Sequence, residues 1–313
     1  MEQTIPVADL SHYHDPSRRE AFIKTVGDAL QSLGFVALEN HGIDQKHFDA
    51  VYGAYRSFFA KDDATKKLAE RAESGRRRGY TSFGVEHAKD SKKPDLKEFF
   101  HVGRELAMDD PMRGRLPENV WPEGEDALKE TSLQVYAELD RVADDILSAF
   151  GLYLGQEASF FPSMVAKGNT ILRVIHYPVC DGFDEPGVMR AAAHEDINLM
   201  TLLAPADESG LELLTREGEW LPIHAIPGQI IVDTGDMMSR ITNDRIPATT
   251  HRVVNPKGTP KPRYSMPFFV HPHLDVDLTV LESCIPDGET AKYEPINNED
   301  FLLERLRAIG LAK

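Results

Sequence analysis

Cysteine, basic charge and long apolar runs are all scarce in this chain of 313 residues. The two cysteines, Cys180 and Cys284, are too few for a disulfide framework and lack the close spacing of a metal site, so we expect free thiols. No apolar run approaches the roughly 20 residues that span a bilayer. The opening "MEQTIPVADL" also lacks the basic and then apolar segments of a signal peptide. We therefore expect a cytoplasmic protein with no membrane partner.

The shortage of basic residues argues against nucleic-acid binding. The formal net charge is −16, and nucleic-acid binders usually carry a basic face that displaces counterions. The one basic cluster, "RAESGRRRGY", contains Arg71, Arg76, Arg77 and Arg78, and on an acidic chain it favours a solvated loop over a site for a small anion. We expect a small-molecule substrate, and the sequence leaves the oligomeric state open.

Two kinds of pattern divide the chain. Apolar residues at helical spacing predict helices over 18–33, ending at Gly34, and over 135–150, ending at Gly151. From about Asn169 to Pro272, short β-branched runs separated by turn residues predict many short strands, which favour a barrel or jelly roll over alternating strands and helices.

The last segment, "NNEDFLLERLRAIG", predicts a helix with Asn298 as its N-cap. We therefore expect a mainly β protein with flanking helices, of the α+β class. Its parts are a mostly helical N-terminal region over 1–155, a strand-rich catalytic core over 156–280, and a C-terminal tail and helix over 281–313.

The segment "AAAHEDINLMTLL", residues 191–203, places ionisable groups at the head of an apolar run, where burial is costly unless they have partners. It lacks a helical rhythm, so we interpret it as one strand, on which residues two apart share a face. His194 and Asp196 then point the same way as Met200 and Leu202. Glu195 points the other way and is expected to be exposed or structural.

A second histidine, His251 in "TTHRVVNP", follows within the strand-rich region. A lone histidine is more often a core residue satisfied by a backbone carbonyl. Two imidazoles and one carboxylate on a rigid β scaffold, however, form the facial triad that suits non-haem Fe(II) and oxygen chemistry. We therefore predict that His194, Asp196 and His251 are the metal ligands and the catalytic residues.

The segment "RYSMPFF" adds Arg263 and Ser265, again two residues apart. A guanidinium can bind both oxygens of a carboxylate, and the hydroxyl adds a contact, so this pair predicts a carboxylate clamp rather than a structural pair. A dicarboxylic 2-oxo acid could chelate iron with one end and reach the clamp with the other. Tyr177, in "HYP", is expected to donate a hydrogen bond to the chelating end, whereas His271 is interpreted as structural.

These motifs resemble the isopenicillin N synthase-like family of Fe(II)/2-oxoglutarate-dependent oxygenases. "HEDINLMTLL", "THRVVNP" and "RYSMPFF" look like the family's His-x-Asp, distal His and Arg-x-Ser signatures. "TIPVADLS", "LGFVALENHGI", "RGYTSFGVE", "LRVIHYP" and "PGQIIVDTGDMM" resemble further landmarks in the same order, across essentially the whole chain. The sequence departs from the family at Asn198, where many relatives have glycine, and at Asp233, where asparagine is frequent.

The resemblance implies a double-stranded β-helix, or jelly-roll, core with iron in its mouth. It also implies 2-oxoglutarate and O₂ as co-substrates, release of succinate and CO₂, and hydroxylation, desaturation or ring closure of a small molecule. Two alternatives remain: an iron oxidase of the same family that needs no 2-oxoglutarate, and a non-catalytic metal-binding sensor or scaffold. Asp233, Gly235 and Asp236 are expected to shape a turn.

Overall fold

Two β-sheets form the centre of the protein. The computed structural model describes residues 5–308 apart from 88–92, 181–187, 207, 224–225, 227, 256–258 and 260. In the larger sheet, the strands follow the order β1-β2-β10-β7-β13-β5-β4-β3, and β12 also pairs with β5. The smaller sheet has the order β6-β11-β8-β9. Except for the parallel pair β1 and β2, the strand pairs within these sheets are antiparallel.

The strands of the larger sheet are β1 (Val7–Asp9), β2 (Phe35–Glu39), β3 (Gly79–Thr81), β4 (Glu98–Gly103), β5 (Ile171–Tyr177), β7 (Met200–Leu203), β10 (Ile230–Thr234), β12 (Arg263–Ser265) and β13 (Pro267–Val270). Those of the smaller sheet are β6 (Ala191–His194), β8 (Leu211–Leu214), β9 (Trp220–Pro222) and β11 (His251–Val253). The helices are α1 (Arg19–Leu33), α2 (Gln45–Phe59), α3 (Asp63–Lys67), α4 (Asp126–Tyr153), α5 (Phe160–Val165), α6 (Asp236–Ile241) and α7 (Asn298–Ala308).

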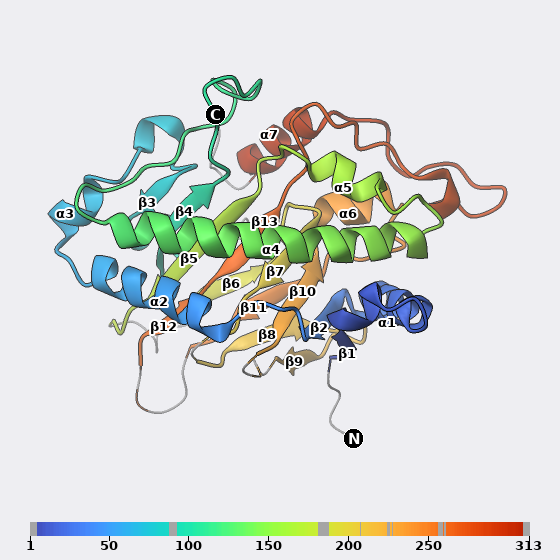
Figure 1. Ribbon diagram of the computed structural model, residues 1–313, viewed down its shortest axis with the longest axis horizontal. Helices are drawn as coiled ribbons and strands as arrows, with labels where there is room; N and C mark the ends of the chain where they lie inside the picture. The colour runs from blue at the N-terminus through green and yellow to red at the C-terminus, as the bar shows by residue number, and fades with distance from the viewer. Residues whose placement is uncertain are drawn as a thin grey trace.

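The two faces of the larger sheet have different partners. Its outer face packs against helices, and the long α4 runs across it with α1 and α2 alongside (Figure 1). Its inner face meets the smaller sheet, where apolar side chains of both sheets join in two smaller clusters. This arrangement of facing sheets with helices on one side confirms the predicted jelly-roll core with flanking helices.

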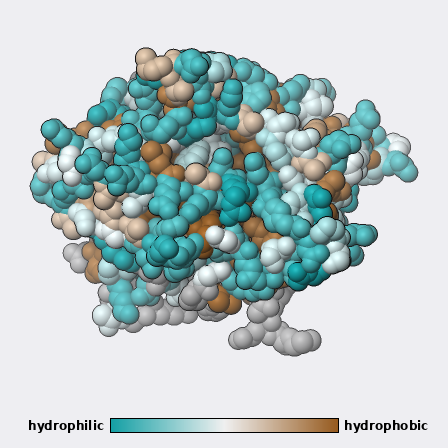
Figure 2. Space-filling view, in the orientation of Figure 1, coloured by the Kyte–Doolittle hydropathy of each residue, from teal (hydrophilic) through white to brown (hydrophobic). Residues whose placement is uncertain are grey.

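The helical cover is amphipathic, as its spacing predicts. The side chains of Val135, Leu139, Val142, Ile146 and Phe150 all lie buried along one stripe of α4. The outward face of this layer is mostly hydrophilic with scattered apolar patches (Figure 2). Among the described helices, none is long and apolar enough to cross a bilayer.

Two helix boundaries differ from the sequence-based prediction. Gly151 does not end the helix, because α4 continues to Tyr153 and Gly151 packs closely on the backbone carbonyl of Glu157. Asn297, rather than Asn298, caps α7, since its side-chain oxygen accepts from the backbone N–H of Glu299 at 2.9 Å. The Asn298 amide instead donates to the backbone carbonyls of Pro272 and His273, each at 3.1 Å.

The prediction of one continuous strand over 191–203 is wrong. β6 ends at His194, the chain turns, and β7 begins at Met200 in the other sheet. Met200 and Leu202 face the helices, whereas Thr201 and Leu203 face inward. A turn places the polar residues between the two strands. Their side chains and backbone groups make hydrogen bonds within this turn instead of the regular bonds between β-strands.

Candidate active site

Three predicted ligands converge where the smaller sheet meets this turn. His194 ends β6 and His251 begins β11, and the two are directly paired, with ring centroids 4.5 Å apart. Asp196 reaches them from the turn, and its Oδ1 lies 4.0 Å from His194 Nε2 and 3.9 Å from His251 Nε2. One ligand atom of each residue lies within 4.8 Å of the others. The donor set is therefore that of a facial triad.

The hydrogen bonds of both imidazoles leave the correct nitrogen free. His194 Nδ1 lies 2.7 Å from the carbonyl oxygen of Ala192, and His251 Nδ1 lies 3.1 Å from that of Thr249. A carbonyl only accepts, so each Nδ1 carries the proton and each Nε2 keeps its lone pair. Both lone pairs are thus available to a metal, with the orientation fixed by the backbone.

The Asp196 carboxylate is also held in place. Its Oδ2 accepts from the Thr201 hydroxyl, which in turn accepts from the Asn198 amide at 2.8 Å. The backbone of the turn packs on the start of α6, where a Cβ at Gly235 would lie 2.6 Å from the Asp196 carbonyl oxygen. Gly235 therefore permits the close approach that fixes the turn carrying Asp196.

The site brings acidic and imidazole side chains together in a buried place. Burial and then the charge of Asp196 raise the pKa of Asp233, on β10, well above its usual value. Burial and then the neighbouring His251 lower the pKa of His194 to about 4, so its imidazole is neutral near pH 7. A neutral imidazole and a carboxylate that repels its neighbour both favour a bound cation.

Arg263 is a buried cation with an incomplete set of partners. It is 2% exposed, its Nε donates to the carbonyl oxygen of Glu208 at 3.2 Å, and its NH1 is buried without a hydrogen bond. Within the described part of the chain, no carboxylate pairs with it. Leaving a buried donor unpaired is costly, so this arrangement fits a carboxylate that arrives with a ligand.

Ser265 and Tyr177 lie on the same inner face as Arg263. In the pairing of β12 with β5, Arg263 is opposite Tyr177 and Ser265 is opposite Ile175. The Arg263 guanidinium lies 5.2 Å from the centre of the Tyr177 ring. Both Tyr177 and Ser265 are buried. The structure thus gathers these three predicted co-substrate residues on one face.

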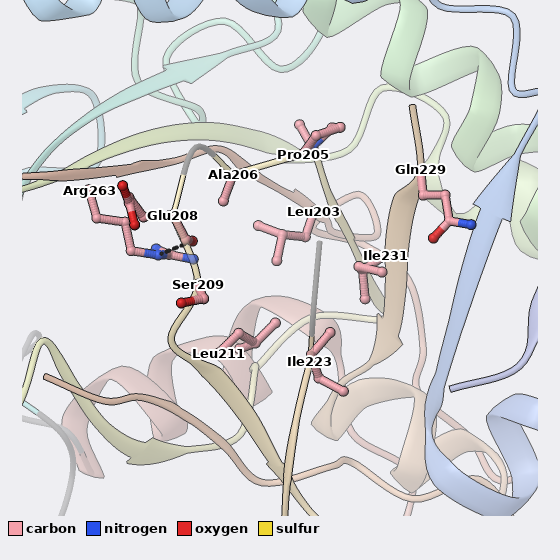
Figure 3. Close-up of a pocket in the computed structure, with 11 residues that line it drawn as sticks. Leu203, Pro205, Ala206, Glu208, Ser209, Leu211, Ile223, Gln229, Ile231 and Arg263 are labelled. Atoms are coloured by element: carbon pink, nitrogen blue, oxygen red, sulfur yellow. Dashed lines mark hydrogen bonds between the residues drawn. The ribbon is translucent and has the colours of Figure 1, made fainter. Parts of the chain in front are cut away.

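A small pocket adjoins Arg263 between the two sheets (Figure 3). Arg263 and Glu208 border it on one side, and apolar side chains supply most of the remaining wall: Leu203, Leu211, Ile223 and Ile231. A low-polarity surround strengthens an ion pair that forms beside it. Arg263 is therefore placed where a carboxylate would be held tightly.

The structure also places three other polar residues of this region, Glu195, Asp233 and Thr201. Glu195 is exposed and accepts from the Thr250 hydroxyl at 3.0 Å. Asp233, predicted to shape a turn, is instead a β10 residue beside Asp196. Thr201 was missed because, on a single strand over 191–203, it would face away from Asp196.

Replacing Thr201 with valine removes the hydroxyl that holds Asp196 and keeps the side-chain shape. Outer-shell hydrogen bonds of this kind typically change metal affinity by about 10 to 100-fold. We expect Thr201→Val to weaken Fe(II) or Co(II) binding by that factor in an anaerobic titration. The matched control is Thr215→Val, in the β8–β9 hairpin, where the hydroxyl accepts from the backbone N–H of Glu219. Equal metal affinity in the two variants would contradict this role of Thr201.

His271 predicts a measurable acid sensitivity. Burial lowers its pKa to about 4, below the value near 6.5 of an unfolded histidine. Between these values the unfolded chain binds the extra proton, so stability falls as the pH drops. We expect protonation linked to His271 to lower the free energy of unfolding by about 2 kcal/mol between pH 7 and pH 5. Urea unfolding of the metal-free proteins should show a smaller loss of stability in His271→Gln than in wild type over this pH range. Identical losses would refute the contribution of His271.

Comparison with known proteins agrees with this geometry. Residues 5–124 match the profile described as "non-haem dioxygenase in morphine synthesis N-terminal", and residues 168–272 match that of the 2OG-Fe(II) oxygenase superfamily. A 2-oxoglutarate-Fe(II) type oxidoreductase of Emericella nidulans, hxnY, is 30% identical over 308 residues, which cover 95% of this chain and 88% of that protein.

Solved structures extend the similarity to three dimensions. A 2OG-Fe(II) oxygenase family protein from Caulobacter crescentus is 38% identical, with a TM-score of 0.87 over 97% of this chain and 99% of that one. A full-length Neurospora crassa protein, solved in complex with α-KG and thymine, is 28% identical, with a TM-score of 0.85 over 97% of this chain and 96% of that one.

Proposed function

Because this chain belongs to the 2OG-Fe(II) oxygenase superfamily, we propose that His194, Asp196 and His251 bind its catalytic iron and that Arg263 and Ser265 bind the far carboxylate of 2-oxoglutarate. Tyr177 donates to the iron-binding end of the co-substrate. The observation that carries the proposal is the convergence of three candidate metal ligands. The same protein also holds a buried arginine, Arg263, whose NH1 has no hydrogen-bond partner.

The protein is an Fe(II)- and 2-oxoglutarate-dependent dioxygenase. Bound iron and 2-oxoglutarate together activate O₂ for oxidation of a small-molecule substrate, with release of succinate and CO₂. The chain's own residues hold and orient the reactants. The two imidazoles are fixed through Nδ1, Thr201 fixes the carboxylate, and Arg263 supplies the charge that compensates a bound dianion.

A small organic substrate suits this protein better than a macromolecule. The net charge of −16 opposes binding to polyanions. The Neurospora protein has been solved with thymine, which is itself a small planar molecule. Hydroxylation, desaturation and ring closure are all compatible with the residues described.

The test is an anaerobic titration of the Fe(II)-loaded protein with 2-oxoglutarate. Chelation of the oxo acid by iron produces a visible charge-transfer band. The expected result is a band that saturates at one equivalent of 2-oxoglutarate per bound iron. Iron binding without such a band would favour the alternatives, a 2-oxoglutarate-independent oxidase or a metal-binding scaffold. Succinate release under air then reports turnover with each candidate substrate.

A further inference from the structure

Arg78 is a buried cation without a counterion among the residues that the structure describes. It is 2% exposed, whereas its neighbour Arg77 is exposed. Its NH1 donates to the carbonyl oxygen of Arg77 and its NH2 to the side-chain oxygen of Asn169, both at 2.8 Å, but its Nε has no partner. No carboxylate among the described residues pairs with it. Burial lowers the pKa of Arg78 only to about 10, so it remains charged near pH 7.

This is the same signature that Arg263 shows at the proposed co-substrate clamp. Both guanidinium groups are almost fully buried, and each has a nitrogen without a partner. Two other cations of the inner face are compensated: the partly buried Arg173 contacts both oxygens of Glu86 at 3.2 Å, and the buried Lys97 lies 2.7 Å from Glu86 and 2.9 Å from Asp95. An uncompensated buried cation is costly, which indicates an anion that is present only when a ligand binds.

Strand register places the Arg78 guanidinium in the same row as the metal site. Thr201, which holds Asp196, is opposite Phe269; Phe269 is opposite Ile171; and Ile171 is opposite Gly103. A Cβ at Gly103 would lie 2.2 Å from the Nε and NH2 of Arg78, so the guanidinium occupies the space over this glycine. The row crosses three strand spacings, about 14 Å. That span fits a small organic molecule.

His271 supplies a second unpartnered group. It follows Phe269 by two residues, is 8% exposed, and its Nδ1 has no hydrogen bond. After burial, the groups that perturb its pKa include Asp196, Arg78 and Arg173, so the imidazole lies within electrostatic reach of the metal site and of both arginines. A neutral imidazole can donate from Nδ1 in one of its tautomers.

We propose that Arg78 and His271 bind the carboxylate of the substrate, so that this enzyme oxidises small carboxylic acids. This inference rests on the proposed function and specifies its substrate class. One uncompensated cation and one neutral donor balance a monoanion, whereas a phosphate dianion would leave excess negative charge. Arg173 does not serve this purpose, because Glu86 and His101 already accept from it.

The test compares Arg78→Met with Arg77→Met in the Fe(II) enzyme saturated with 2-oxoglutarate under anaerobic conditions. The probes are hexanoate and 3-phenylpropanoate, each beside its neutral amide, and calorimetry gives their affinities. We expect wild type and Arg77→Met to bind the carboxylates at least tenfold more tightly than the amides. Arg78→Met should lose that preference, and His271→Gln should weaken carboxylate binding about fivefold.

Stability separates a ligand-binding arginine from a structural one. Replacing an uncompensated buried cation with an apolar side chain of similar volume should leave the melting temperature of Arg78→Met unchanged or raise it by a few degrees. A fall of more than about 5 °C would assign Arg78 to the framework and overturn the proposal. Equal binding of carboxylates and amides by wild type, or no carboxylate binding at all, would overturn it as well.

The charge-transfer band distinguishes this failure from failure of the proposed function. If wild type forms the 2-oxoglutarate band but the carboxylate preference is absent or independent of Arg78, only the substrate inference fails. If no band forms in wild type, the proposed function fails. A band lost in Arg78→Met would place the residue at the co-substrate, which also contradicts a substrate role.

Discussion

Replacing Arg263 with alanine is expected to raise the KM for 2-oxoglutarate while Fe(II) affinity stays unchanged. The guanidinium is buried, and its NH1 has no partner in the free protein. Truncating one member of a buried, hydrogen-bonded charge pair costs about 2 to 5 kcal/mol. The expected increase in KM is therefore between about thirtyfold and several thousandfold. Succinate formation at varied 2-oxoglutarate measures the change, and anaerobic iron titration checks the metal site.

Two further variants sharpen this test. Arg263→Lys keeps the charge but cannot bind both carboxylate oxygens in a fork, so its KM should fall between those of wild type and alanine. Arg252→Ala is the matched control, because Arg252 pairs with Glu212 at 2.7 Å and lies over the Trp220 ring. An unchanged KM in Arg263→Ala would refute the clamp.

Replacing Asp196 with alanine is expected to abolish iron-dependent turnover. Asp196 supplies the only carboxylate of the described three-residue donor set and lies within 4.0 Å of both histidine Nε2 atoms. Its loss leaves two neutral ligands, so Fe(II) affinity should fall by more than about 100-fold, beyond the effect of an outer-shell change. His194→Ala should act in the same direction. Anaerobic metal titration and succinate release measure both effects.

The melting temperature distinguishes loss of a metal ligand from general unfolding of the variant. In the metal-free protein, burial and then the Asp196 charge raise the pKa of Asp233, so removing Asp196 takes away a neighbour that opposes ionisation of Asp233. The melting temperature of metal-free Asp196→Ala should therefore match or exceed that of wild type. The control is Glu195→Ala, next to it in sequence but exposed. Wild-type turnover in Asp196→Ala would exclude it as a metal ligand.

Helix positions and the chemistry of the site are readable from local sequence because both depend on short-range patterns. The stripe of Val135 to Phe150 predicts α4, and Gly34 ends α1 with a positive φ of 71°. Helix ends are harder to predict: Gly151 lies within α4, and Gly155, with a positive φ of 76°, follows the end of the helix instead.

The geometry at Asp196 shows how predicted residues can come together through a conformation other than the predicted one. The pairing of His194 with Asp196 was predicted from strand alternation, but a turn produces it. That turn depends on Thr201, Asn198 and Gly235, and Gly235 is remote from the turn in sequence. Alternation of side chains holds only while a strand continues, and the polar residues after His194 end it.

By itself, the sequence determined the fold class, the family and the candidate residues for binding metal and co-substrate, because these follow from periodicity, composition and motifs. Only the tertiary structure decided that Asp233 lies beside Asp196 and that Arg78, in a cluster predicted to be solvated, is buried with no carboxylate partner in the described part of the chain. Burial and charge compensation arise from contacts between segments far apart along the chain. No local pattern in the sequence encodes them.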